Sequence, residues 1–249
     1  MDVWESAAMT VPSPAADAHV QSLHRYPVKS TSGESLVSAQ VDARGLVGDR
    51  GWAVRDPDGK LGSGKSTRRF RRMPGLLDLV ARLGDDGVPV LRLPGGTTLR
   101  VDDPAVHGAV SDHVGRPVTV APEAEVSHFD DGPLHLVTTS TVRAVEAALG
   151  RPVDPRRFRP NLVLGTDGDG FVEDAWIGRE LAVGPEVVVR VLMAMPRCVM
   201  LNMGQRDGVP ADPDVLQTVA AANDTTAGVL AEVVRPGTVT VGDAVRVLA

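Results

Sequence analysis

Short runs in which hydrophobic and polar residues alternate dominate the first half of the chain. Alternation with a period of two places successive side chains on opposite faces of an extended backbone, so each run predicts a half-buried β-strand. Turn-forming sequences stand between the runs, such as DPDG at 56–59 and PGG at 94–96. A short helix is expected at 105–114. The predicted strands are 20–24, 36–41, 52–55, 77–82, 88–93 and 118–120.

The second half of the chain begins with the pattern of an amphipathic helix. Val142, Val145 and Leu149 recur at intervals of three and four residues, which places them on one face of a helix. Hydroxyl residues just before this stretch can cap its N-terminus, and Gly150 can end it. A further helix is expected at 213–222. The strands predicted in this half are 161–164, 186–195, 231–234, 238–241 and 244–248.

An acidic, turn-rich segment at 121–133 separates the two halves, and we predict a domain boundary there. The period of two in both halves favours closed or packed sheets over a nucleotide-binding α/β sheet. The expected fold is therefore mainly β with a few helices, in the α+β class. A loose tail rich in Ala and Pro precedes it.

Composition narrows the possible functions. Hydrophobic residues make up 43% of the chain and aromatic residues only 3%, so the core must consist mainly of Val, Leu and Ala. A net charge of −6 argues against general affinity for nucleic acid. The first residues lack the basic start of a secretion signal, and no apolar run approaches membrane-spanning length. We expect a cytoplasmic protein with no nucleic-acid or membrane partner.

Residues 59–66, GKLGSGKS, match the nucleotide-binding pattern G-x-x-x-x-G-K-[ST]. A working phosphate-binding loop lies between a buried apolar strand and a helix whose N-terminal amides face the phosphates. Here the polar sequence VRDPDG leads into the match, and Pro74 would end any following helix after about two turns. We interpret the stretch as a hairpin turn followed by a basic loop.

The single cysteine, Cys198, follows an apolar strand and stands next to Arg197. One cysteine excludes an internal disulfide, a zinc site with several cysteines and a protein-held iron–sulfur cluster. A lone cysteine is commonly an inert part of a core. However, Pro196 ends the strand, and an adjacent cation favours the thiolate that binds metals or attacks electrophiles. Both interpretations stay open on these residues alone.

Basic residues fall in short clusters in this acidic chain, and such clusters are commonly solvated surface. The motifs KS at 29–30 and RPN at 159–161 combine cations with hydroxyl or amide donors, which suits a phosphate or another oxyanion. If the fold brings these motifs near Cys198, the site would hold an anionic ligand beside a soft sulfur donor.

Six motifs follow one another along most of the chain: LHRYPVKS, RGLVGDRGWAVRD, RFRPNLVL, FVEDAW, MPRCVM and RPGTVTVGDAVRVL. Together they resemble the motifs of MOSC-domain proteins that carry the associated N-terminal β-barrel domain. The family includes the amidoxime-reducing molybdenum enzymes. The resemblance implies a flexible tail at 1–18, an N-terminal β-barrel-like domain at 19–122 and a MOSC β-barrel domain at 123–249.

The same resemblance implies that the molybdenum cofactor (Mo-molybdopterin), a pyranopterin with a terminal phosphate, binds in the cleft between the two domains. Cys198 corresponds to the cysteine that ligates molybdenum, and it would be both the metal ligand and the catalytic residue. The cofactor-binding residues implied in this way are Lys29, Ser30, Arg50, Thr67, Arg68, Thr138, Ser140, Arg159, Asn161 and Arg197.

The implied activity is reduction of N-hydroxylated or other N-oxygenated small molecules. With a single cysteine the chain cannot hold its own cluster, so a separate flavin, haem or iron–sulfur protein would deliver the electrons. The main alternative is a non-redox carrier that transfers sulfur or the cofactor through a Cys198 persulfide. A third is a cofactor-free binding protein. Leu201 and Asn202 stand where reductase members usually have two threonines, which leaves the substrate class open.

Overall fold

The computed structural model describes residues 17–248 and shows a mainly β fold with three α-helices in that range. The expected tail at 1–18 lies outside the described residues except for its last two, and Ala18 already begins the first strand. The prediction of a mainly β fold is confirmed. No helix within the described range is both long and apolar enough to cross a membrane.

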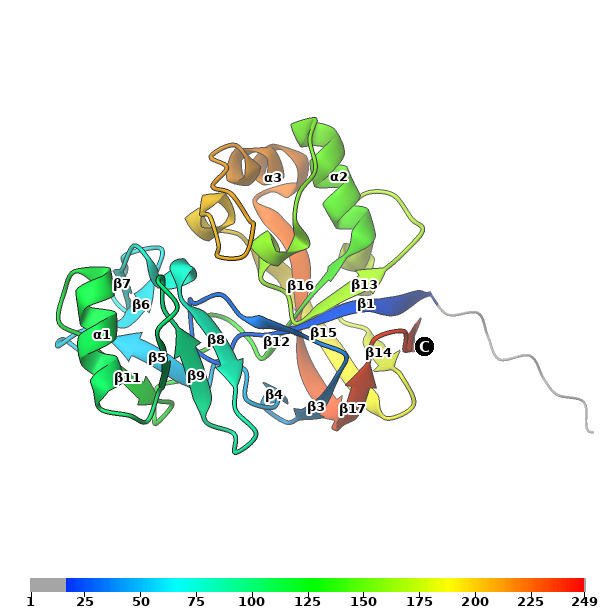
Figure 1. Ribbon diagram of the computed structural model, residues 1–249. Helices are drawn as coiled ribbons and strands as arrows, with labels where there is room; N and C mark the ends of the chain where they lie inside the picture. The colour runs from blue at the N-terminus through cyan, green and yellow to red at the C-terminus, as the bar shows by residue number, and fades with distance from the viewer. Residues whose placement is uncertain (1–16, 249) are drawn as a thin grey trace, which may run out of the picture.

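The largest sheet closes into a seven-stranded barrel (Figure 1). Its ring order is β13-β12-β16-β15-β14-β18-β1, and β1 pairs with β13 to close the ring. An eighth strand, β2, extends one edge of β1. The strands of this sheet are β1 Ala18–Arg25, β2 Glu34–Leu36, β12 Leu134–Thr138, β13 Leu162–Gly165, β14 Glu180–Val183, β15 Val187–Pro196, β16 Thr226–Arg235 and β18 Ala244–Val247.

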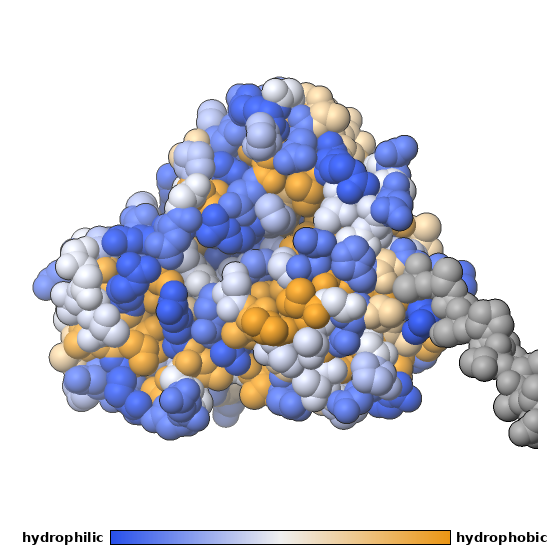
Figure 2. Space-filling model, turned by 45° about the vertical axis from the view of Figure 1, so that its right-hand side comes forward, coloured by the Kyte–Doolittle hydropathy of each residue, from blue (hydrophilic) through white to orange (hydrophobic). Residues whose placement is uncertain are grey.

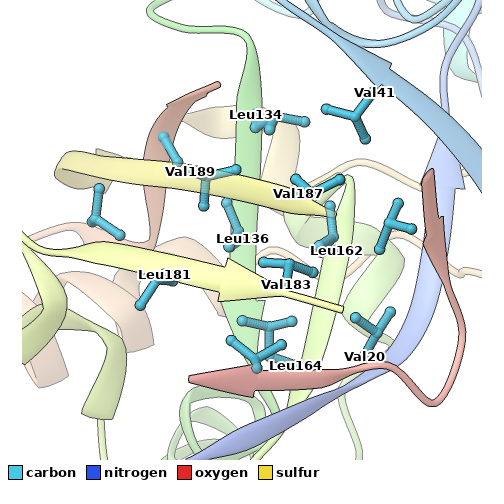
Figure 3. Close-up of a cluster of buried hydrophobic side chains, with 14 of the residues drawn as sticks. Val20, Val41, Leu134, Leu136, Leu162, Leu164, Leu181, Val183, Val187 and Val189 are labelled. Atoms are coloured by element: carbon cyan, nitrogen blue, oxygen red, sulfur yellow. The ribbon is translucent and has the colours of Figure 1, made fainter. Parts of the chain in front are cut away.

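Branched aliphatic side chains fill the barrel. Figure 3 shows Val20, Leu136, Leu164 and Val183 pointing toward one another from four different strands, and none of them is more than 1% exposed. Burying a Val or Leu side chain completely contributes about 1.5–3 kcal/mol. The core therefore explains why a chain with few aromatic residues can still form a barrel.

The first half of the chain adds a smaller β module on one side of the barrel (Figure 1). Two sheets, in the orders β11-β5-β6-β7 and β10-β9-β8, pack with helix α1 around a separate apolar core. The elements are β5 Trp52–Arg55, β6 Leu61–Ser63, β7 Phe70–Arg72, η1 Leu76–Asp78, β8 Val80–Leu83, β9 Pro89–Arg92, β10 Thr98–Arg100, α1 Ala105–Val114 and β11 Thr119–Pro122.

A third small sheet, in the order β17-β3-β4, joins the two ends of the chain. Gly237 of β17 pairs with Val41 of β3, and Val41 also packs into the barrel core. The strands are β3 Ser38–Asp42, β4 Gly45–Leu46 and β17 Gly237–Thr240. Sheet pairings therefore run across the predicted boundary at 122.

Helices α2 and α3 pack together over the other side of the barrel (Figure 1). The side chain of Thr138 caps α2 by accepting from the backbone N–H of Thr141, and Gly150 ends the helix in a left-handed conformation with φ 73°. The remaining helices are α2 Thr139–Leu149, η2 Pro155–Phe158, η3 Val172–Trp176, η4 Val199–Asn202 and α3 Val215–Asn223.

The stretch that matches a nucleotide-binding loop has no such structure. Gly59 lies in the turn of the β5–β6 hairpin, where its N–H donates to the Asp56 carbonyl. The basic residues after Ser66 lead into strand β7, so the loop is not followed by a helix. The prediction of a hairpin turn and a basic loop is confirmed.

Candidate functional site

A pocket opens where the small β module meets the barrel; we call it the thiol pocket because Cys198 lines it. Figure 2 shows that the surface is hollowed between the upper and lower-left parts of the molecule and that hydrophilic residues gather in the hollow. The remaining residues that line the pocket are Lys29, Ser30, Arg50, Lys65, Asp130, Asp131, Gly132, His135, Phe158, Arg159, Asn161, Met195, Pro196, Arg197, Met200, Leu201 and Leu230.

Three of these residues hold an uncommon backbone conformation. Ser30, Arg50 and Arg159 have φ values of 63°, 51° and 54°, in the left-handed region that non-glycine residues rarely adopt. The backbone N–H of Arg50 donates to the Tyr26 carbonyl at 2.8 Å and so helps to hold one of these turns. Such strain is retained where the surrounding structure enforces it, and it is frequent at functional sites.

Arg159 brings an uncompensated charge into the thiol pocket. Its guanidinium lies 4.2 Å from the centre of the Tyr26 ring, and the Arg50 guanidinium lies 5.0 Å from the same ring. Arg159 is only 9% exposed, and both terminal nitrogens, Nη1 and Nη2, lack a hydrogen-bond partner. Burial lowers the pKa of Arg159 to about 10. A buried cation with unused donors is suited to an anionic ligand.

Lys29 is the second buried cation of the thiol pocket. Its Nζ donates to the His128 carbonyl at 2.6 Å and forms an ion pair with Asp130. Burial lowers the pKa of Lys29 to about 8, although the Asp130 carboxylate acts in the opposite direction. Burial acts to raise the pKa of Asp130, but the attraction of Lys29, with smaller contributions from Lys65 and Arg50, holds it below its ordinary value. Arg50 is neutralised in a similar way by an ion pair with Asp49.

Arg197 is a further cation of the thiol pocket and directly precedes Cys198 in the chain. Its Nη2 donates to the Phe158 carbonyl at 2.7 Å, Nη1 lies 3.4 Å from His135 Nε2, and Nε has no partner. Burial lowers the pKa of Arg197 to about 10. Burial and the charge of Arg197 hold the pKa of His135 well below its ordinary value, so the imidazole is neutral at pH 7.

Cys198 is half-buried at the end of β15, directly before η4. No group of three or more His, Cys, Asp or Glu residues within 17–248 is arranged to hold a metal ion. Cys198 can therefore supply one ligand to a metal, and the other ligands would have to come from a cofactor.

The thiol pocket brings together seven of the eleven site residues implied by the sequence: Lys29, Ser30, Arg50, Arg159, Asn161, Arg197 and Cys198. The Asn161 side chain already has protein partners. It accepts from the His135 N–H at 3.1 Å and donates to the His24 carbonyl at 3.3 Å, so it links β12 to β1.

Four other residues from the same prediction do not line the thiol pocket. Thr67 accepts from backbone N–H groups within its own loop, and Arg68 is exposed beside it. Thr138 caps α2, and Ser140 bonds to Thr166 with Oγ atoms 2.6 Å apart. Their part in ligand binding stays a prediction.

Sequence reasoning did not single out several residues that line the pocket, including Lys65, Asp130, Asp131 and His135. Lys65 is the lysine of the false nucleotide motif and begins the basic loop, so its charge was a visible signal. The two aspartates lie in the acidic segment that was interpreted only as a domain boundary. Nothing in the sequence shows that this segment folds back onto Lys29.

Comparison with known families identifies the class of protein. Residues 103–246 match the MOSC domain, and residues 17–125 match the MOSC N-terminal beta barrel domain. The chain therefore belongs to the MOSC-domain family, and the resemblance seen in the sequence motifs is confirmed.

Three named relatives are similar over most of this chain. Human mitochondrial amidoxime-reducing component 1 is 24% identical and Bos taurus mitochondrial amidoxime reducing component 2 is 25% identical; each alignment covers 80% of this chain and 70% of the relative. Molybdenum cofactor sulfurase from Oryza sativa subsp. japonica is 26% identical over 83% of this chain. The alignment spans only 31% of that longer protein.

A solved structure supports the fold independently. The YUAD protein from Bacillus subtilis superposes with a TM-score of 0.51 at 14% identity, and the match covers 92% of this chain and 93% of that protein. The likeness concerns the fold alone.

Proposed function

We propose that the thiol pocket binds the molybdenum cofactor and that the protein is an oxidoreductase that reduces N-oxygenated small molecules. The observation that carries this proposal is the combination of a half-buried thiol with the buried, unpartnered guanidinium of Arg159 in one pocket. The names of the relatives, two amidoxime-reducing components and a molybdenum cofactor sulfurase, point the same way.

The residues present fit such a cofactor. Its terminal phosphate needs cationic donors, and Arg159 offers two free N–H-bearing nitrogens; Lys29 and Arg50 lie in the same pocket, each paired with an aspartate. The Cys198 sulfur would be the protein ligand to molybdenum, and Arg197 precedes it in the chain. When bound, the cofactor supplies two-electron redox chemistry, and the protein orients it and excludes competing ligands.

Electrons and substrate come from outside this chain in the proposed activity. The sequence contains one cysteine, so it cannot hold an iron–sulfur cluster. A separate donor protein carrying flavin, haem or iron–sulfur would therefore reduce the metal. The apolar wall beside Cys198, formed by Met195, Met200 and Leu201, would contact the body of a small-molecule substrate.

A carrier function is the second candidate. The Oryza sativa relative is named a molybdenum cofactor sulfurase, and Cys198 is accessible enough to carry a persulfide. In that case the labile sulfur would be found on Cys198, and the protein would transfer sulfur or the cofactor without a change in metal oxidation state.

The deciding experiment is elemental and pterin analysis of the protein purified from a host that makes the cofactor, beside its Cys198→Ser variant. Near-stoichiometric molybdenum that falls in the variant supports the reductase proposal, and reduction of an N-hydroxylated test compound with a chemical reductant would follow. Sulfane sulfur on Cys198 without bound metal supports the carrier. Full molybdenum loading and full reductase activity in Cys198→Ser would refute the ligand assignment.

A further inference from the structure

A second pocket lies on the other side of Tyr26, and we call it the arginine pocket. It has a volume of about 330 Å³ and is formed by the end of β1, the segment leading into β2, strand β8, helix η2 and the loop after η4. Its lining includes His24, Tyr26, Glu34, Arg82, Arg156 and Arg206. None of them lines the thiol pocket.

The arginine pocket carries an excess of positive charge. Arg156 is paired with Asp154 at 2.6 Å, and the two carboxylates in the lining are also paired: Glu34 with Arg25 at 2.8 Å and Asp207 with Arg92 at 3.3 Å. Arg82 and Arg206 form no ion pair with any residue in 17–248. The lining residues and their ion-pair partners together contain five arginines and three carboxylates, so two positive charges are not balanced.

A buried hydroxyl in the wall of this pocket also lacks a partner. Tyr26 is 3% exposed, and its hydroxyl makes no hydrogen bond within the described part of the chain. Burial raises the pKa of Tyr26 to about 12, while the charges of Arg159 and Arg50, and then that of Arg156 in the same pocket, act to lower it. A buried O–H without an acceptor is unfavourable, so such a group usually faces a water or a ligand.

His24 adds no charge to the arginine pocket. His24 Nε2 lies 3.0 Å from the Ser22 hydroxyl and Nδ1 lies 3.2 Å from the Ser35 hydroxyl, so both ring nitrogens have partners. Burial and the charge of Arg156 lower its pKa to about 4, which makes the ring neutral at pH 7. The two free arginines and the Tyr26 hydroxyl are thus the groups available to a ligand.

We propose that the arginine pocket is an oxyanion site that binds a phosphate group, with Arg82 and Arg206 supplying the charge and the Tyr26 hydroxyl donating a hydrogen bond. Guanidinium groups match phosphate oxygens in geometry as well as in charge. The site is distinct from the proposed cofactor site. Since Tyr26 contacts both Arg50 and Arg159, its ring forms the wall between the two pockets.

The test is calorimetric titration of inorganic phosphate into the full chain at low ionic strength. We compare Arg82→Ala/Arg206→Ala with Arg116→Ala/Arg179→Ala, a control that removes two arginines lining neither pocket. The Arg159→Met variant removes the unpartnered cation of the thiol pocket and so weakens the competing site, whether or not a cofactor is bound. In that background, loss of the two pocket arginines should weaken phosphate binding about tenfold or more, because charge-assisted hydrogen bonds are lost.

Equal affinity in the pocket variant and the control pair would overturn the proposal. Tyr26→Phe gives a second reading, because the ring and its stacking on Arg159 are retained. Phosphate should raise the melting temperature of Tyr26→Phe less than that of the wild type. An equal rise would show that the Tyr26 hydroxyl does not bind the phosphate. Tighter binding of glycerol 3-phosphate than of inorganic phosphate would assign the site to a phosphate ester, and the reverse order to the free ion. A missing molybdenum cofactor would leave all of these outcomes unchanged.

Discussion

Replacing Arg159 by Met should make the cofactor-free protein more stable while weakening its hold on an anionic ligand. The side chain is buried, and its guanidinium has two unpartnered nitrogens. A pKa of about 10 in place of 12.5 means that burial disfavours the charged form by about 3 kcal/mol. Methionine is unbranched and apolar, so it removes this term and still fills space beside Tyr26.

The gain is partly offset by the lost stacking contact. A cation on an aromatic ring, such as Arg159 at 4.2 Å from the Tyr26 ring centre, contributes about 0.5–2 kcal/mol. The net rise in the free energy of unfolding should therefore be about 1–2 kcal/mol. The backbone term is unchanged, because methionine meets the same left-handed φ of 54° as arginine. For a chain of this size the melting temperature should rise by about 2–4 °C per kcal/mol.

The assay pairs denaturant unfolding of the cofactor-free protein with molybdenum retention of the loaded protein. Loss of charge-assisted hydrogen bonds, each about 1.5–3 kcal/mol, should weaken retention at least about tenfold. Arg179→Met is the matched control: Arg179 is exposed, and its substitution should change stability by less than about 0.5 kcal/mol. A less stable Arg159→Met protein with undiminished retention would refute the reasoning, since it would show that the guanidinium serves the fold and not a ligand.

Three further predictions concern Lys29 of the thiol pocket and two buried positions outside its lining, Glu173 and Gly228. The pKa of Lys29 is about 8, so its ammonium loses its proton between pH 7 and pH 9. Phosphate binding to the thiol pocket should therefore fall about tenfold over this range, and the Lys29→Arg variant should show no such fall. Glu173→Ala should lower the free energy of unfolding in urea by about 2–4 kcal/mol, because it leaves the buried Thr138 hydroxyl without its 2.6 Å acceptor; Glu173→Gln keeps an acceptor and should lose far less. Gly228→Ala should destabilise the barrel by about 2 kcal/mol or more in the same assay, since φ is 78° and a Cβ would meet the Leu136 carbonyl oxygen at 2.5 Å; wild-type stability would contradict the close packing.

The local pattern of the sequence predicted most elements, because strand and helix periodicity depends on neighbouring residues. Helix α1 has the predicted bounds, and Gly150 ends α2 as expected. The run 36–41 was predicted as one strand, but the structure divides it into β2 and β3 with Val37, 77% exposed, between them. The short strands β12 and β14 were missed, since neither shows the alternation of a half-buried strand clearly.

Closure of the barrel could not be predicted from local patterns. It depends on the pairing of Leu23 with Leu162, which are far apart in the chain. The pattern of neighbouring residues does not predict which distant strands will pair. The thiol pocket has the same origin: motif chemistry identified Lys29, Arg159 and Cys198, but the return of Asp130 onto Lys29 follows from the path of the linker. The division of the chain at 122 stays a prediction, and sheet pairings cross it.

The pairing of the first strand with the last has a consequence for biosynthesis. Strand β1 leaves the ribosome early, but its partner β18 begins at Ala244, so β1 must wait on the order of 10–40 s at typical rates of translation. During that interval its unpaired edges are exposed to other chains. The thiol pocket draws residues from both sides of this closure. A ligand that needs the complete pocket can therefore be inserted only after β18 has been made, and until then its binding competes with aggregation through the unpaired edges.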